Sequence, residues 1–227
     1  MSEMDKYLRC TEFIDFDEIS VKEKAEALTR GLQTEREKAV ALYYFVRDGI
    51  RHNAYAPPHD PGRYKASVTL EAGNGFCQQK SVLLVALARA VGIPSRLGFI
   101  DVNDYQLAES ARKIVGGINL LPFHGYAELF VNGKWVHVSP CFDLETCRRK
   151  RFVPVDFDGL NDAKDSPCDQ DGRPHIEHVN DHGTYDDFPW DEMRSYYKGW
   201  VARLGLDWDE LMQLGEQIRQ SKFYGDR

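Results

Sequence analysis

The chain has 227 residues, of which 42% are hydrophobic, and 36 acidic against 29 basic side chains give it a net charge of −7. This composition supports a folded core and argues against disorder and against an electrostatic nucleic-acid binder, which needs a basic surface. The first ten residues, MSEMDKYLRC, do not resemble a secretory signal, and the strongly apolar run 82–88 is too short to span a bilayer. Five cysteines without framework spacing indicate reduced thiols. We therefore expect a cytoplasmic protein that binds neither nucleic acid nor membrane.

Helical patterns dominate the first fifty residues. Residues 17–32 have weak helical periodicity, and Thr34 with Glu37 predicts a capping box ahead of a helix to about Asp48. Residues 53–67 are expected to form a loop because they contain three prolines and a glycine.

The stretch GNGFCQQKSVLLVALARAVGIPSR, residues 73–96, places one cysteine at the start of an apolar helix. Apolar residues cover nearly all faces from Cys77 to Val91, which predicts a buried helix, and Gly92 and Pro94 end it. A helix N-terminus lowers the pKa of a thiol, and its free N–H groups stabilise an oxyanion. Cys77 is therefore a candidate nucleophile, although buried cysteines are also common packing residues.

The segment HGYAELFVNGKWVHVSP, residues 124–140, follows a predicted strand over 95–102 and has the pattern of a β-hairpin. Asn132-Gly133 between two apolar runs is typical of a type I′ turn. A two-residue turn sets the register, so Val131 faces Lys134, and continuing the ladder brings His124 opposite Cys141.

His124 is the candidate general base in this hairpin, because a nucleophilic thiol needs one. Ser139 and Asp143 are both diagonal neighbours of His124 in the extended register, and either side chain is able to accept a hydrogen bond from the imidazole. Electrostatics favours Asp143, because a carboxylate stabilises an imidazolium better than a hydroxyl does. Strand continuity favours Ser139, because the chain is expected to bend after Pro140.

The remainder of the chain is more polar. Residues 156–187 are expected to form a long, partly irregular excursion, and at least one helix is expected in the tail, around 208–220. Helices, a buried central helix and then antiparallel strands predict one α+β domain over residues 1–227.

Two polar clusters in this region contain residue types that bind metal ions. Cys168, His175, His178 and His182 match no named zinc motif. The acidic side chains of 156–171 do not follow the EF-hand spacing and are expected to form a solvated loop. We therefore expect no metal and no cofactor.

The three segments GNGFCQQKSVLLVALARAVGIPSR, HGYAELFVNGKWVHVSP and CFD together resemble the transglutaminase-like superfamily of cysteine enzymes over about residues 36–145. The likeness is to the bacterial cysteine protease type, and it extends in part to residues 152–189. It implies a transglutaminase-like, papain-like α+β fold in which a buried central helix packs on an antiparallel sheet. It also implies Cys77 as nucleophile and His124 as base. The family's usual aspartate before the proline is replaced here by Ser139, and Asp143 is our candidate for the third member.

Three functions follow from this interpretation. The leading one is a cysteine hydrolase or protease that cleaves an amide or peptide bond through a Cys-His-Asp triad and a thioester acyl-enzyme. The second is a transglutaminase-type transfer of the acyl group to an amine. The third, suggested by Ser139, is a catalytically silent transglutaminase-like binding domain.

Overall fold

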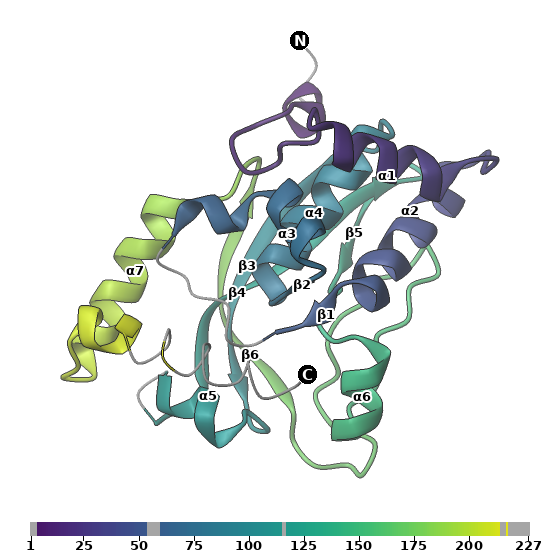
Figure 1. The fold of residues 1–227 in the computed structure, drawn as a ribbon. Coiled ribbons are helices and arrows are strands. Elements are labelled where there is room, and N and C mark those ends of the chain that lie inside the picture. Colours follow the sequence, from purple (N-terminus) through teal and green to yellow (C-terminus); the bar gives the residue numbers. More distant parts are fainter. Residues whose placement is uncertain (1–3, 54–59, 115–116, 214–216, 218–227) are drawn as a thin grey trace.

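The computed structural model describes residues 4–53, 60–114, 117–213 and 217, and its centre is one four-stranded antiparallel sheet (Figure 1). The sheet order is β5-β4-β3-β6. Its strands are β3 (Ser95–Asp104), β4 (Leu120–Val131), β5 (Lys134–Val138) and β6 (Ile176–Tyr185). A short parallel pair, β1 (Arg51–His52) with β2 (Asn74–Gly75), lies apart from it.

The helices surround this sheet. The α-helices are α1 (Ile19–Thr29), α2 (Glu35–Tyr44), α3 (Ala66–Ala72), α4 (Cys77–Ala90), α5 (Glu109–Ile114), α6 (Leu144–Lys150) and α7 (Trp190–Arg203). Shorter turns are η1 (Asp5–Leu8), η2 (Phe45–Gly49) and η3 (Pro61–Tyr64), and residues 208–213 are also helical. The α+β prediction is confirmed, with α1 to α4 gathered on one face of the sheet (Figure 1). Within the described residues, no helix is long and apolar enough to cross a membrane.

Helix α4 is the centre of the core. Twelve consecutive residues, from Gln78 to Arg89, are buried, because the helix packs on β4 and β3 and is covered by α1, α2 and α3. Even Lys80 is fully buried, and its ammonium donates a hydrogen bond to the carbonyl of Arg47 at 2.9 Å. The all-round apolar pattern therefore correctly predicts a central buried helix.

Several local predictions are confirmed. Thr34 and Glu37 form the reciprocal capping box of α2, and η2 continues that helix to Gly49. Asn132 and Gly133 have φ values of 52° and 80°, as a type I′ turn requires, and the hairpin register holds from Val131↔Lys134 to Ala127↔Val138.

Other predictions fail where the pattern is weak. Helix α3 begins at the end of the segment predicted to be a loop, whose middle part, 54–59, lies outside the described residues. The excursion 156–187 contains strand β6, which pairs antiparallel with β3. The ladder β4–β5 ends at Val138, so the predicted pairing of His124 with Cys141 does not form. The prediction of a tail helix around 208–220, by contrast, is confirmed over 208–213, and the rest of its predicted extent lies outside the described residues except 217.

Gly125 allows β4 to approach the start of α4. A Cβ atom at this position would lie 2.8 Å from the Cα of Gln78, which is closer than a carbon contact permits. The backbone of the helix cannot give way as a flexible side chain would, so a side chain here forces the helix and the strand apart.

We expect Gly125→Ala to lower the free energy of unfolding by about 1–3 kcal/mol, because it overpacks a close backbone contact. The measurement is urea denaturation followed by circular dichroism. Gly199→Ala is the matched control, since its Cβ in α7 would have its nearest neighbour at 3.7 Å. It is expected to be neutral or to stabilise by up to about 1 kcal/mol. Equal effects of the two substitutions would contradict the close-approach argument.

Candidate active site

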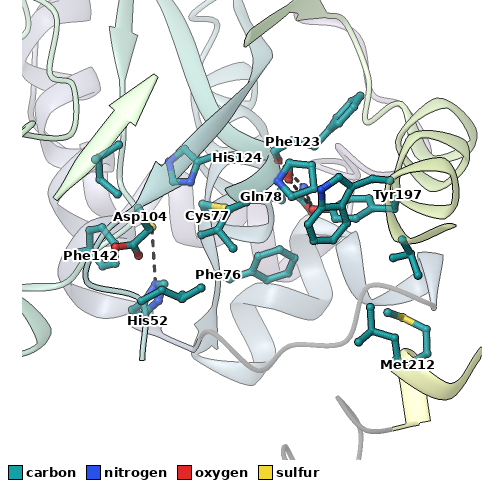
Figure 2. Close-up of a pocket in the computed structure, with 18 of the residues that line it drawn as sticks. His52, Phe76, Cys77, Gln78, Asp104, Phe123, His124, Phe142, Tyr197 and Met212 are labelled. Atoms are coloured by element: carbon teal, nitrogen blue, oxygen red, sulfur yellow. Dashed lines mark hydrogen bonds between the residues drawn. The ribbon is translucent and has the colours of Figure 1, made fainter. Parts of the chain in front are cut away.

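Cys77 lies at the N-terminus of α4, where the helix meets β4 and the β1–β2 pair (Figure 2). It is half-buried and borders a cavity of about 160 Å³. The preceding Phe76 has extended backbone, and its N–H donates to the side chain of Gln79 at 3.3 Å. The first-turn N–H groups of an α-helix have no partner within the helix. Cys77 therefore occupies the positive end of a buried helix.

His124 enters the site from β4, beside the thiol. His124 and Cys77 line the same cavity, and the two side chains are close enough for each to shift the pKa of the other. The side chain of His124 is only 5% exposed. The structure thus brings together the two residues that the sequence predicts as nucleophile and base.

Asp165 contacts His124 and is the third polar side chain of the site. Its carboxylate oxygen Oδ2 lies 3.2 Å from Nε2 of His124, which leaves Nδ1 for the thiol. Ser139 donates its hydroxyl proton to the same carboxylate oxygen. The Asp165 side chain is 4% exposed, so it does not belong to a solvated acidic loop as its neighbours in sequence suggested.

Asp143 is not placed beside His124. Its carboxylate caps α6, accepting hydrogen bonds from the Thr146 N–H at 2.8 Å and from the Thr146 hydroxyl at 3.0 Å. It also accepts from the His52 N–H at 2.7 Å. The reason is that β5 ends at Val138, so the alternation from which we extrapolated does not reach residue 143. An aspartate just ahead of a helix is instead satisfied by the free N–H groups of that helix.

Asp165 reaches His124 through backbone pairing at the end of β5. The Ser139 N–H donates to the carbonyl of Ala163 at 2.9 Å, and the Ala163 N–H donates to the carbonyl of His137 at 2.8 Å. This parallel bridge between Val138 and Ala163 carries the chain past Ser139, and Asp165 follows two residues later. The carboxylate thus lies next to the serine that replaces the usual aspartate before Pro140. The sequence signal was only an acidic cluster, in which Asp165 had no distinguishing spacing.

Charge stabilises the reactive form of the thiol. A hydrogen bond from Cys141, together with the positive charge of His124, lowers the pKa of Cys77 well below its ordinary value despite burial. Burial opposes protonation of His124, but the charge of Cys77 and the hydrogen bond to Asp165 raise its pKa well above the usual range. Burial likewise acts to raise the pKa of Asp165, and the bonds from His124 and Ser139 outweigh it. All three directions favour a thiolate, an imidazolium and a carboxylate.

A second thiol and imidazole, those of Cys141 and His52, also line the cavity beside Cys77. The Cys141 sulfur is 3.7 Å from Nδ1 of His52, and burial raises the pKa of Cys141 well above its ordinary value. Burial also lowers the pKa of His52 to about 3, so this imidazole is neutral near pH 7. Because Asp143 accepts from the His52 backbone, it is linked to the site through His52 and Cys141 and not through His124.

A polar network fixes the backbone immediately before His124. Phe123 has a φ of 52°, which is rare for a residue with a side chain, and its N–H donates to the buried Asp101 at 3.0 Å. The same carboxylate accepts from His182 and from the Tyr196 hydroxyl, each at 2.6 Å. The carbonyl of Phe123 accepts from the Gln78 side chain at 2.6 Å. This network ties the residue preceding His124 to the residue following Cys77.

The cysteine and histidines considered for metal binding make separate contacts. The ring of His175 stacks on Phe152 at 3.8 Å, whereas His182 binds Asp101. Within the described part of the chain, no group of three or more histidine, cysteine or acidic side chains has the arrangement of a metal site.

The model of the transglutaminase-like superfamily matches residues 22–140, which is more than half of the chain. The chain belongs to this superfamily. A comparison with curated protein sequences finds no match.

A comparison with solved structures gives two matches. One is a proposed cysteine protease from Cytophaga hutchinsonii, with 14% identity, a TM-score of 0.48, and coverage of 82% of this chain and 55% of that chain. The other is a proposed protease from Parabacteroides distasonis, with 18% identity, a TM-score of 0.39, and coverage of 60% and 28%. The chain therefore spans about half the length of the first protein and less of the second.

Removing the charge of Asp165 tests the electrostatic coupling. Without that charge the pKa of His124 falls, the imidazolium is lost at lower pH, and the pKa of Cys77 rises. We expect Asp165→Asn to raise the pKa of Cys77 by about one unit or more. The measurement is thiolate absorbance at 240 nm against pH, with Cys77→Ala subtracted as the baseline.

Asp143→Ala is the matched comparison. Loss of the helix cap lowers the free energy of unfolding by about 1 kcal/mol. Because Asp143 reaches Cys77 only indirectly, through the His52 backbone and Cys141, its loss should shift the pKa of Cys77 much less than Asp165→Asn does. If Asp143→Ala shifted the thiolate titration as far as Asp165→Asn does, the assignment of Asp165 to His124 would be wrong.

Proposed function

We propose that the protein is a cysteine hydrolase that cleaves an amide or peptide bond, with Cys77 as nucleophile, His124 as acid and base, and Asp165 as the group that orients and charges His124. The observation that carries this proposal is the contact of one buried imidazole with both a helix-terminal thiol and a buried carboxylate. Each of these three groups is unfavourable to bury alone, and together they match the requirements of nucleophilic catalysis.

The reaction follows from the roles of these groups. The Cys77 thiolate attacks the substrate carbonyl carbon, and the first-turn N–H groups of α4 stabilise the resulting oxyanion. The C–N bond then breaks as the imidazolium of His124 gives its proton to the leaving amine. The products of this half-reaction are a free amine and a thioester on Cys77.

Water completes the cycle. Neutral His124 takes a proton from the water molecule that attacks the thioester carbonyl, and the C–S bond breaks to return the thiolate and a carboxylic acid. Asp165 accepts a hydrogen bond from Nε2 throughout and stabilises each imidazolium that forms, as in other triads. Ser139 holds the Asp165 carboxylate by its own hydrogen bond.

The pKa of Cys77 and the partner of His124 also distinguish an enzyme from a catalytically silent binding domain. That hypothesis predicts an ordinary pKa for Cys77 and no acid within hydrogen-bond reach of His124. The short contact to Asp165 and the lowered pKa of Cys77 support a catalytic role instead.

Alkylation supplies the direct test. At pH 6 we expect iodoacetamide to modify Cys77 at least about tenfold faster than the exposed Cys168, because the thiolate persists below the pKa of a free thiol. The site of modification is mapped by peptide mass spectrometry. Hydrolysis of a peptide library should be lost in Cys77→Ala and retained in the matched control Cys168→Ala.

A labelled primary amine in the same assay separates hydrolysis from acyl transfer. Incorporation of the amine at the expense of the free acid would assign the acyl-enzyme to transamidation. Slow alkylation of Cys77, together with undiminished hydrolysis in Cys77→Ala, would remove Cys77 from the chemistry altogether.

A further inference from the structure

The cavity beside Cys77 has one wall that the proposed chemistry does not use. This wall, which we call the apolar wall, consists of Tyr197, Trp200 and Val201 of α7 together with Trp208, Leu211 and Met212. These side chains form part of a second hydrophobic cluster, and Tyr197 also packs against the main core. Trp208 and Met212 are only half-buried, so a bound apolar group has surface to cover.

The size of the cavity suits one large side chain. Its volume is about 160 Å³. A dry apolar cavity of about 150 Å³ in another protein accommodates a benzene ring. The cavity, which reaches from Cys77 and His124 to the apolar wall, therefore has room for an aromatic or branched aliphatic side chain against that wall.

The charges around the cavity are unevenly distributed. Among the described residues that line it, Asp104 is the only acidic one, and no lysine or arginine is present. Figure 2 shows Asp104 near His52 and Phe142, on the opposite side of Cys77 from Tyr197 and Met212. A charged substrate side chain against the apolar wall would lose its hydration without gaining a partner, which is costly.

The position of His124 orients the substrate across Cys77. In the proposed reaction His124 protonates the leaving amine, so the leaving group lies on the side of His124. Figure 2 shows His124 and the labelled residues of the apolar wall, Tyr197 and Met212, on different sides of Cys77. The acyl part of the substrate therefore extends from the carbonyl toward the apolar wall.

We propose that the apolar wall binds the acyl-side residue of the substrate, and that this residue has an aromatic or large aliphatic side chain. The substrate class is thus an amide or peptide whose scissile bond follows a bulky apolar residue. This inference rests on the proposed function, because it uses His124 as the proton donor to the leaving amine.

Chloromethyl ketones of single N-acetylated amino acids test the proposal without a known substrate. The thiolate displaces chloride and forms a thioether, and the side chain of the reagent occupies the acyl position. We expect the phenylalanine and leucine reagents to modify Cys77 about tenfold or more faster than the glycine reagent, and the aspartate and lysine reagents to show no such gain. Rates are measured by mass spectrometry at several reagent concentrations.

Two variants that add the same charge test whether the phenylalanine-to-glycine rate ratio depends on the apolar wall. Met212→Glu places a carboxylate in the apolar wall and should reduce the phenylalanine-to-glycine rate ratio to about threefold or less. Gln213→Glu adds the same charge at the next, exposed position, outside the cavity lining, and should leave the ratio unchanged. Circular dichroism confirms that both variants are folded.

Three outcomes would contradict the assignment of the apolar wall to the acyl-side side chain. They are equal rates for all reagents, a preference for a charged reagent, and equal phenylalanine-to-glycine ratios in the two variants. The glycine reagent reports separately on the nucleophile. If it modifies Cys77 at pH 6 faster than Cys168 while the ratios are flat, the proposed function stands and the apolar pocket does not. If Cys77 shows no advantage over Cys168 with any reagent, the proposed function fails as well.

Discussion

The hydrogen bond between His124 and Asp165 joins two segments that are separated by 41 residues in the chain. Both side chains are almost completely buried, and a buried charge is tolerated only when it is paired and hydrogen-bonded. The imidazole is paired on both sides, by the carboxylate and by the Cys77 sulfur. The other elements of the site can be understood as holding these three groups in contact in a place where none would be stable alone.

Three kinds of backbone structure deliver the three groups. A buried helix N-terminus supplies the thiol, a central strand supplies the imidazole, and an irregular segment bridged to the end of β5 supplies the carboxylate. Gly125 makes the first two meet closely, since its lack of a side chain lets the strand approach the Gln78 backbone. Asp101 accepts a hydrogen bond from the N–H of Phe123 and so stabilises the positive φ of the residue just before His124. Rigid elements and their polar supports thus set the geometry of the contact among these three groups.

The sequence predicts the first two groups because their signals are local. The apolar pattern after Cys77 identifies a buried helix, and Asn132-Gly133 sets a register that the structure follows as far as Ala127 and Val138. Beyond Val138 the alternation no longer applies, and Asp143 is bound by the N-terminus of α6. The bridge between Val138 and Ala163 depends on the path of residues 139–162, which form α6 and are otherwise irregular, and periodicity contains no information on that path. For the same reason strand β6 was missed, since most of its side chains are exposed and show no apolar alternation.

The late position of Asp165 in the chain has a consequence for biosynthesis. During N- to C-terminal synthesis, α4 and the β4–β5 hairpin emerge from the ribosome before the segment that contains the carboxylate. Until residues 163–165 pair with the end of β5, His124 lacks the partner that holds its proton, and Cys77 lacks the full electrostatic support for its thiolate. The thiol of the nascent chain therefore cannot gain this full electrostatic support until synthesis has passed residue 165.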